Sequence, residues 1–384
     1  MSFAESRPRL PAITSLRYFA ALHVAIFHIR EMGALPGPAW FQNLASIGYV
    51  GVSFFFVLSG FILVYTYAGR DMSVRAFWRA RFARIYPAYV FSLLVTFPFF
   101  YFGTHKMQIP FFAWSTTHFW ESVVLVVTLV QAWIPPAALA WNAVAWSLSV
   151  EAFFYVLFPF LLVRYSRLSR TALWTIILAC WMAGLAISIG YMALRPASAG
   201  PVTSMEWGAG VQFVKFFPLV RLPEFLMGMA CGWLFLRREK NSGTGLIPVL
   251  AGLAGVALVA ALDKRLPYLV IHTAILGPAF AGIVYGVALE PRWASWLNNR
   301  ALVLFGDASY SFYLLHSMFV WPFFHDFKTQ AVRNQSYLGL LAWIAMTTGI
   351  CILVYKFIEE PSRRKLRGKR KAPALAVKVA AELT

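Results

Sequence analysis

The stretch ITSLRYFAALHVAIFHIREM, residues 13–32, is an apolar run interrupted by a few ionisable side chains. A helix of this length rises about 30 Å, the thickness of the hydrocarbon core of a bilayer. Arg17 and His28 lie eleven residues apart within it, almost three helical turns, so both side chains project from one face about 16 Å apart along the axis. Ionisable side chains in membrane helices are costly and usually face a polar interior. We therefore expect a functional stripe on this face.

The rest of the sequence has the composition of a membrane protein. Of its 384 residues, 60% are hydrophobic and 13% are charged, and the mean hydropathy is +0.65. Apolar runs of about 20 residues recur from end to end, which predicts an all-α, polytopic membrane protein. The first run is too polar to be a cleavable signal peptide. The three cysteines of the protein lie in three separate apolar runs and do not have the spacing of metal ligands, so we expect no metal site.

The distribution of basic residues predicts the orientation of the protein in the membrane. The net charge is +19. With both termini on one side, the loops and ends of that side carry 23 lysines and arginines, whereas the opposite loops carry six. Because basic residues are retained in the cytoplasm, we expect both termini to be cytoplasmic. This excess is explained by topology and anionic lipids, and we expect no nucleic-acid partner.

The number of membrane spans follows from that orientation. Eleven apolar candidates are present, but an odd number of crossings cannot leave both termini on one side. The weakest candidate is 120–134, which is short and precedes Pro135-Pro136. We expect it to be re-entrant or interfacial, leaving about ten transmembrane helices and a long outer segment over 103–145. The predicted organisation is a single membrane domain over 1–362 and a basic cytoplasmic tail over 363–384.

Several polar residues fall at comparable predicted depths. His28, Glu151 and His316 are each expected in the outer half of a span, and a carboxylate that holds an imidazole helps it to take a proton from a hydroxyl. At the cytoplasmic side, Arg81 and Arg84 are three residues apart and adjacent if helical. Such a pair resembles a fork for a phosphate group.

An ordered set of motifs resembles the bacterial acyltransferase family 3 of integral membrane O-acyltransferases. The resemblance covers residues 13–362, and its specificity lies in the order of the set, because each motif alone is weak. The motifs are the Arg17 and His28 pair, GYVGVSFFFVLSGF (48–61), RFARIYP (81–87), WSLSVE (146–151), RLPEFLMG (221–228), SYSFYLLH (309–316) and EEP (359–361).

This resemblance implies a substrate pair and a location. The donor would be acetyl-CoA or another short acyl-CoA on the cytoplasmic side, with no tightly bound cofactor. The acceptor would be a hydroxyl of a cell-envelope or exported glycan, or of a lipid-linked saccharide, and the enzyme would lie in the bacterial inner membrane. Many relatives carry a soluble C-terminal hydrolase-like domain, whereas this sequence ends in a short basic tail.

The resemblance also implies roles for individual residues. Arg81 and Arg84 would hold the phosphates of CoA at the cytoplasmic rim, and Arg17 would continue the basic path inward. His28 would act as the general base on the acceptor hydroxyl or would briefly carry the acyl group, and Glu151 would orient its imidazole. The sequence leaves both chemical routes open.

The sequence leaves open the roles of three further residues, and two other functions compete with acyl transfer. His316 is either a site member or a structural partner of a neighbouring span. Arg221 and Glu224, one helical turn apart, either contact substrate or neutralise each other. The competing functions are a proton-coupled transporter or flippase and a non-catalytic export scaffold, because buried ionisable residues also line transport pathways. The hydrophobic pattern shows no inverted repeat, which argues against a transporter. The oligomeric state is not assigned.

Overall fold

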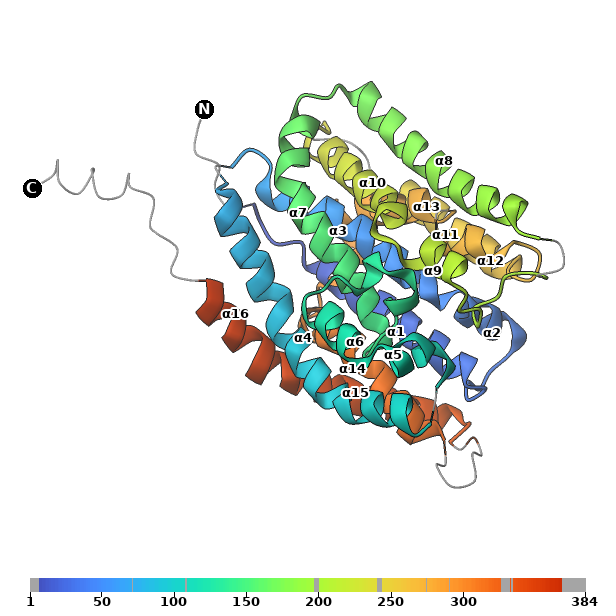
Figure 1. Cartoon of the computed structure of the whole chain (residues 1–384). Helices are drawn as coiled ribbons and strands as arrows, with labels where there is room; N and C mark the ends of the chain where they lie inside the picture. The colour runs from blue at the N-terminus through green and yellow to red at the C-terminus, as the bar shows by residue number, and fades with distance from the viewer. Residues whose placement is uncertain are drawn as a thin grey trace, which may run out of the picture.

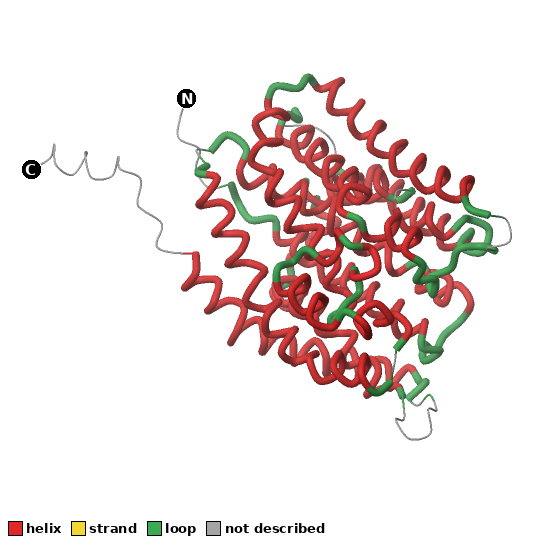
Figure 2. The backbone as a smooth tube through the Cα atoms, in the orientation of Figure 1, coloured by secondary structure: helices red, strands yellow, loops and turns green. Residues whose placement is uncertain are grey.

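The computed structural model shows a bundle of helices in which the N-terminal helices lie between two outer groups (Figure 1). Helix α8 runs along one edge of the bundle, and α15 and α16 run along the opposite edge. Outside the helices the backbone forms loops and turns (Figure 2). The structure describes residues 7–70, 72–107, 109–196, 200–239, 244–273, 275–289, 291–325, 332 and 334–367.

The described elements are helical, apart from one isolated bridge between His325 and Val332. Short 3-10 turns connect several of the helices, and η8 (Tyr355–Glu359) is a π-helical turn between α15 and α16. The α-helices are α1 (Pro11–Glu31), α2 (Ala39–Ser46), α3 (Gly51–Tyr67), α4 (Val74–His105), α5 (Ala113–Thr117), α6 (Phe119–Val127), α7 (Trp146–Ser166), α8 (Arg170–Leu194), α9 (Ala209–Phe216), α10 (Pro218–Leu236), α11 (Leu246–Ala261), α12 (Tyr268–Thr273), α13 (Gly277–Ala288), α14 (Arg300–Phe324), α15 (Tyr337–Val354) and α16 (Glu360–Arg367).

The helices have the length and composition of a polytopic membrane protein. Within the described residues, eight helical segments are long and apolar enough to cross a bilayer. Of the helices outside that set, two have more than ten residues: α11, which is apolar but has only 16 residues, and the 25-residue α14, which contains Asp307 and His316. The all-α membrane architecture predicted from the sequence is therefore confirmed. The predicted basic tail begins inside α16, and its residues from 368 onward lie outside the described part of the chain.

Close helix packing depends on glycines at two contacts. On α14, a Cβ atom at Gly306 would lie 2.0 Å from the carbonyl oxygen of Thr14 on α1. On α10, a Cβ atom at Gly228 would lie 2.0 Å from the carbonyl oxygen of Val57 on α3. Small residues of this kind allow membrane helices to approach backbone to backbone. They hold α1 against α14 and α3 against α10.

The segment between α4 and α7 differs from the long outer segment expected over 103–145. Residues 120–134 form the nine-residue α6 followed by a 3-10 turn, and nine residues rise only about 14 Å. The chain then enters the bundle instead of staying at its surface. The Trp141 indole donates to the carbonyl of Leu93 in the middle of α4 at 3.0 Å, and the Asn142 amide donates to the carbonyl of Leu314 at 3.0 Å. Buried polar groups need such partners, so this segment is fixed inside the protein.

Candidate functional site

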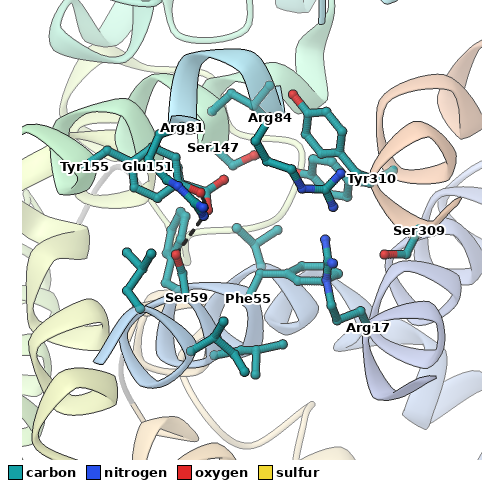
Figure 3. A pocket seen from close by; sticks show the side chains of 17 residues that line it. Arg17, Phe55, Ser59, Arg81, Arg84, Ser147, Glu151, Tyr155, Ser309 and Tyr310 are labelled. Atoms are coloured by element: carbon teal, nitrogen blue, oxygen red, sulfur yellow. Dashed lines mark hydrogen bonds between the residues drawn. The ribbon is translucent and has the colours of Figure 1, made fainter. Parts of the chain in front are cut away.

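A cavity of about 200 Å³ lies among α1, α3, α4, α7 and α14. Arg17, Arg81, Arg84 and Glu151 converge on it from three different helices (Figure 3). Arg17 is the seventh residue of α1 and Arg81 the eighth residue of α4, so both lie about 10 Å from the start of their helices. The remaining polar side chains around the cavity are Ser59, Ser147, Tyr155, Ser309, Tyr310 and Tyr313.

Arg84 is held by the carboxylate of Glu359. The two side chains form an ion pair in which Glu359 is 1% exposed, and the second oxygen of that carboxylate accepts a hydrogen bond from Ser311 at 2.9 Å. The Arg84 guanidinium also lies over the ring of Tyr310, 5.5 Å from its centre. These contacts fix the direction of Arg84, which points into the cavity towards Arg17 (Figure 3).

Arg81 and Glu151 form the opposite wall of the cavity. The Arg81 guanidinium donates to the Tyr67 hydroxyl at 3.2 Å and lies within 5.8 Å of the ring centres of Tyr67 and Tyr155. Glu151 accepts hydrogen bonds on one carboxylate oxygen from Ser59 at 3.1 Å and from Tyr155 at 2.5 Å. Its carboxylate is therefore held by two hydroxyl groups beside the arginine.

The cavity carries an excess of positive charge. Three guanidinium groups and one carboxylate line it, and Glu359 neutralises Arg84 from behind. Among the described residues, no hydrogen bond or ion pair joins Arg17 to a carboxylate. Because a cation removed from water without a counter-ion is costly, this arrangement favours an anionic ligand that reaches Arg17 and Arg81 together. Arg81 and Arg84 lie at the same cavity, as predicted. The two differ in that Arg84 pairs with Glu359, whereas Arg81 has no acidic ion-pair partner within 4 Å in the described chain.

His28 and His316 form a second group away from the arginines. The centres of their rings are 5.2 Å apart with an interplanar angle of 35°. His316 is fully buried, and its Nδ1 lies 2.7 Å from the carbonyl oxygen of Tyr313. Neither histidine is among the residues that line the cavity. The structure thus brings together the two histidines predicted at similar depth.

Glu151, the third residue predicted at that depth, lies with the arginines instead. Glu151 accepts hydrogen bonds from the hydroxyl groups of Ser59 and Tyr155 at the cavity, whereas His28 packs against His316 and Phe27. The expected orientation of His28 by Glu151 is therefore not present in this structure. The depth estimate assumed that α7 starts at the outer surface, but the segment before α7 enters the bundle, so Glu151 lies deeper.

Arg221 and Glu224 form a separate buried ion pair. The Arg221 guanidinium lies 3.0 Å from the Glu224 carboxylate, and both side chains are at most 3% exposed. Arg221 also donates to the carbonyl of His272 at 2.8 Å and to the Ser53 hydroxyl at 2.9 Å. Of the two roles considered for Arg221 and Glu224, substrate contact and mutual neutralisation, these contacts correspond to mutual neutralisation. The pair joins α10 to α3 and α12.

Sequence reasoning assigned no role to Tyr155, which lines the arginine cavity, or to Glu359, which pairs with Arg84. Tyr155 lies one helical turn after Glu151, which is the spacing that places two side chains on one face of a helix. Glu359 belongs to the EEP motif. Its position directly after the last apolar run could have indicated that its carboxylate pairs with a buried cation. Within the described residues, no three His, Cys, Asp or Glu side chains are grouped in a way that could hold a metal ion.

Comparisons with known proteins find relatives that match nearly the whole chain. The family described as "Acyltransferase domain" matches residues 10–356. "Acyltransferase MdmB" of Streptomyces mycarofaciens is 31% identical over 391 aligned residues, which cover 96% of this chain and 95% of that protein. No solved structure matches this chain significantly.

Two similar proteins are longer than this chain. "O-acetyltransferase OatA" of Staphylococcus aureus is 24% identical, and the alignment covers 93% of this chain and 57% of that protein. "Putative peptidoglycan O-acetyltransferase YrhL" of Bacillus subtilis is 26% identical, with 92% and 55% covered. The chain thus spans just over half the length of these two relatives.

Proposed function

Because this chain belongs to the acyltransferase family that matches residues 10–356, we propose that it moves an acetyl or other short acyl group from acyl-CoA to the hydroxyl of a glycan. It is a membrane acyltransferase by family. The donor, the acceptor, the side of the membrane and the residue roles that follow are parts of the proposal. The observation that carries it is the convergence of Arg17, Arg81 and Arg84 on one cavity.

The arginine cavity would bind the donor. CoA carries several phosphate groups, and guanidinium groups bind phosphate through charge-assisted, often bidentate hydrogen bonds. Arg17 has no ion-pair partner in the described chain, and Arg81 donates only one neutral hydrogen bond, to Tyr67. A phosphate would therefore meet the unmatched charge of this cavity. Arg84, already fixed by Glu359, would add a third positive group in a set position.

His28 would perform the chemistry on the acceptor. In direct transfer, its imidazole takes the proton of the acceptor hydroxyl as that oxygen attacks the thioester carbonyl. The new C–O bond replaces the C–S bond, and the CoA thiolate leaves. In the relay route, the imidazole takes the acyl group first and then passes it to the hydroxyl. Both routes give the same ester and release the same free CoA.

The acyl group must travel from the arginine cavity to His28. The two positions differ by about 16 Å along α1. Phe55 and Tyr313 line the cavity with their ring centres 5.9 Å apart, and the Tyr313 ring also lies 5.9 Å from that of His316. This ring pair would have to separate for the thioester to pass. A Phe55→Trp variant should therefore slow transfer and keep donor binding, whereas Phe55→Leu should transfer normally. Equal rates in both variants would place the transfer on the cytoplasmic side.

The proposed orientation in the membrane has ten spans. The eight segments that are long and apolar enough, together with α11 and α14, would give an even number of crossings. The excess of basic residues on the side of the termini supports a cytoplasmic location for both. The segment with α6 would enter from the outer side and return. This topology places the starts of α1 and α4, and with them the arginine cavity, towards cytoplasmic acyl-CoA. The location would be the bacterial inner membrane.

Inside-out vesicles provide the test of the proposal. With labelled acetyl-CoA and a glycan extract of the source cells, the protein should release free CoA thiol in proportion to the label transferred to glycan. His28→Ala should abolish transfer and retain CoA binding. His23→Ala is the matched control, because His23 lies on the same helix and bonds the carbonyl of Leu44. Vesicles that take up glycan without releasing CoA would indicate a transporter and refute the proposal.

A further inference from the structure

The ring of His316, on α14, lies beside the ring of His28, on α1. The ring centres are 5.2 Å apart, and α1 and α14 are held together by the close contact between Gly306 and Thr14. A separation of this size leaves room for one N–H···N hydrogen bond of about 2.9 Å between the ring edges. The two histidines are thus positioned to act on each other.

The hydrogen bonds of His316 define which of its nitrogens carries a proton. Its Nδ1 lies 2.7 Å from the carbonyl oxygen of Tyr313. A carbonyl oxygen can only accept, so Nδ1 must be the donor in this contact. In a neutral imidazole the other nitrogen, Nε2, then carries a lone pair and can accept a hydrogen bond. The backbone of α14 therefore sets the tautomer of His316.

The Nε2 atom of His316 has no partner among the described residues. It is buried, and the residue is 0% exposed. Buried polar side-chain atoms usually find a partner, and one that does not calls for a functional explanation. The other rings against His316 are those of Phe312, 6.1 Å away, and Tyr313, 5.9 Å away, while the Tyr313 hydroxyl is engaged with Ser147 and Val144. His28 is the neighbour that can supply a proton.

We propose that His316 is the positioning residue for His28, with its Nε2 accepting the hydrogen bond that His28 donates. This contact would fix the tautomer of His28, so that the opposite nitrogen of His28 presents its lone pair to the acceptor hydroxyl. When His28 takes the proton of that hydroxyl, the lone pair of His316 stabilises the imidazolium. His316 thereby supplies the orienting contact that the sequence assigned to Glu151. The inference rests on the proposed function of His28.

Three substitutions separate this role from simple packing. His316→Phe keeps a ring of similar size but has no acceptor atom. His316→Gln retains a strong acceptor near the position of Nε2, and His316→Met has a comparable length with only a weakly accepting thioether. His23→Phe is the matched control, because it removes a histidine of α1 whose bond is to the backbone of Leu44.

The assay is transfer from labelled acetyl-CoA to the glycan extract in vesicles, with kcat and the donor KM measured separately. His316→Phe and His316→Met should lower kcat about 10²-fold, the size of one acid–base contribution, and leave the donor KM unchanged. His316→Gln should recover most of the lost rate. If His316→Phe does not insert, the comparison of His316→Met with His316→Gln gives the same answer.

The combination with His28 completes the test. If His316 acts through His28, His316→Phe should cause no further loss of any residual rate that His28→Ala retains above the enzyme-free background, because residues that act as a unit are not additive. Full activity of His316→Phe, or an equal loss in the Gln and Met variants, would overturn the inference while leaving the proposed function intact. An inactive wild-type protein, in contrast, would refute the proposed function itself.

Discussion

Gly306→Ala tests whether the contact between α1 and α14 positions the site. The added Cβ atom would lie 2.0 Å from the carbonyl oxygen of Thr14, whereas real Cβ contacts are essentially never below 3.0 Å. The two helices must therefore separate by about 1 Å, because both sides of the contact are backbone and cannot rotate away. That shift would reach Arg17, three residues beyond Thr14, and Ser309, three residues beyond Gly306.

The magnitude has two opposing contributions. Overpacking costs about 1–3 kcal/mol, and replacing glycine by alanine within a helix gains about 1 kcal/mol. We expect a net loss of about 1–2 kcal/mol, because a backbone contact belongs at the upper end of the overpacking range. A displacement of about 1 Å between catalytic groups can also lower the rate about 10²-fold.

The assay compares Gly306→Ala with Gly349→Ala in detergent. A Cβ atom at Gly349, on α15, would meet nothing within 4 Å, so this control should keep or slightly raise the apparent Tm and keep the transfer rate. Gly306→Ala should lower both. If the two variants show the same Tm and the same rate, the close contact at Gly306 does not position the site, and the reasoning is refuted.

Three further predictions address charge and topology. Replacing Arg81 and Arg84 together by Gln should raise the acyl-CoA KM with little change in the acceptor KM; an unchanged donor KM would limit these arginines to a topological role. Glu359→Leu should destabilise the protein by about 3–5 kcal/mol, because it leaves the buried Arg84 unpaired, and Glu359→Leu with Arg84→Leu should recover part of this loss in thermal unfolding. Cysteines at the exposed positions Lys106 and Arg167 should react with an impermeant thiol reagent from outside and inside, respectively; labelling from the same side would mean that residues 120–134 cross the membrane.

Much of the site could be predicted because helical spacing is regular. The eleven-residue spacing of Arg17 and His28 places them at two levels of one helix, and the three-residue spacing of Arg81 and Arg84 places both at one cavity. Five residues correspond to about 140° around an ideal helix, which puts His23 on another face than His28, and His23 bonds the carbonyl of Leu44. The relative positions of side chains on one helix could therefore be predicted, because they depend only on the rise and turn per residue.

Predictions that need the depth of a helix end were less secure. Glu151 was placed beside His28 on the assumption that its helix starts at the outer surface. The preceding segment instead enters the bundle, where Trp141 and Asn142 bond backbone carbonyls of α4 and α14. Hydropathy cannot distinguish a tryptophan at the membrane interface from one buried among helices. The depth of such a segment depends on tertiary contacts that the sequence does not show.

The distance between the arginine cavity and the histidine pair has an electrostatic consequence for the proposed mechanism. At an effective dielectric constant of about 20, a cation about 4 Å from His28 would oppose its protonation by about 4 kcal/mol, enough to cancel the benefit of a general base. At the axial separation of about 16 Å between Arg17 and His28, the same repulsion is about 1 kcal/mol. The base can therefore take a proton while Arg17, on the same helix, takes part in binding an anion. His316, a neutral acceptor beside His28, stabilises that proton without adding a second charge to the interior.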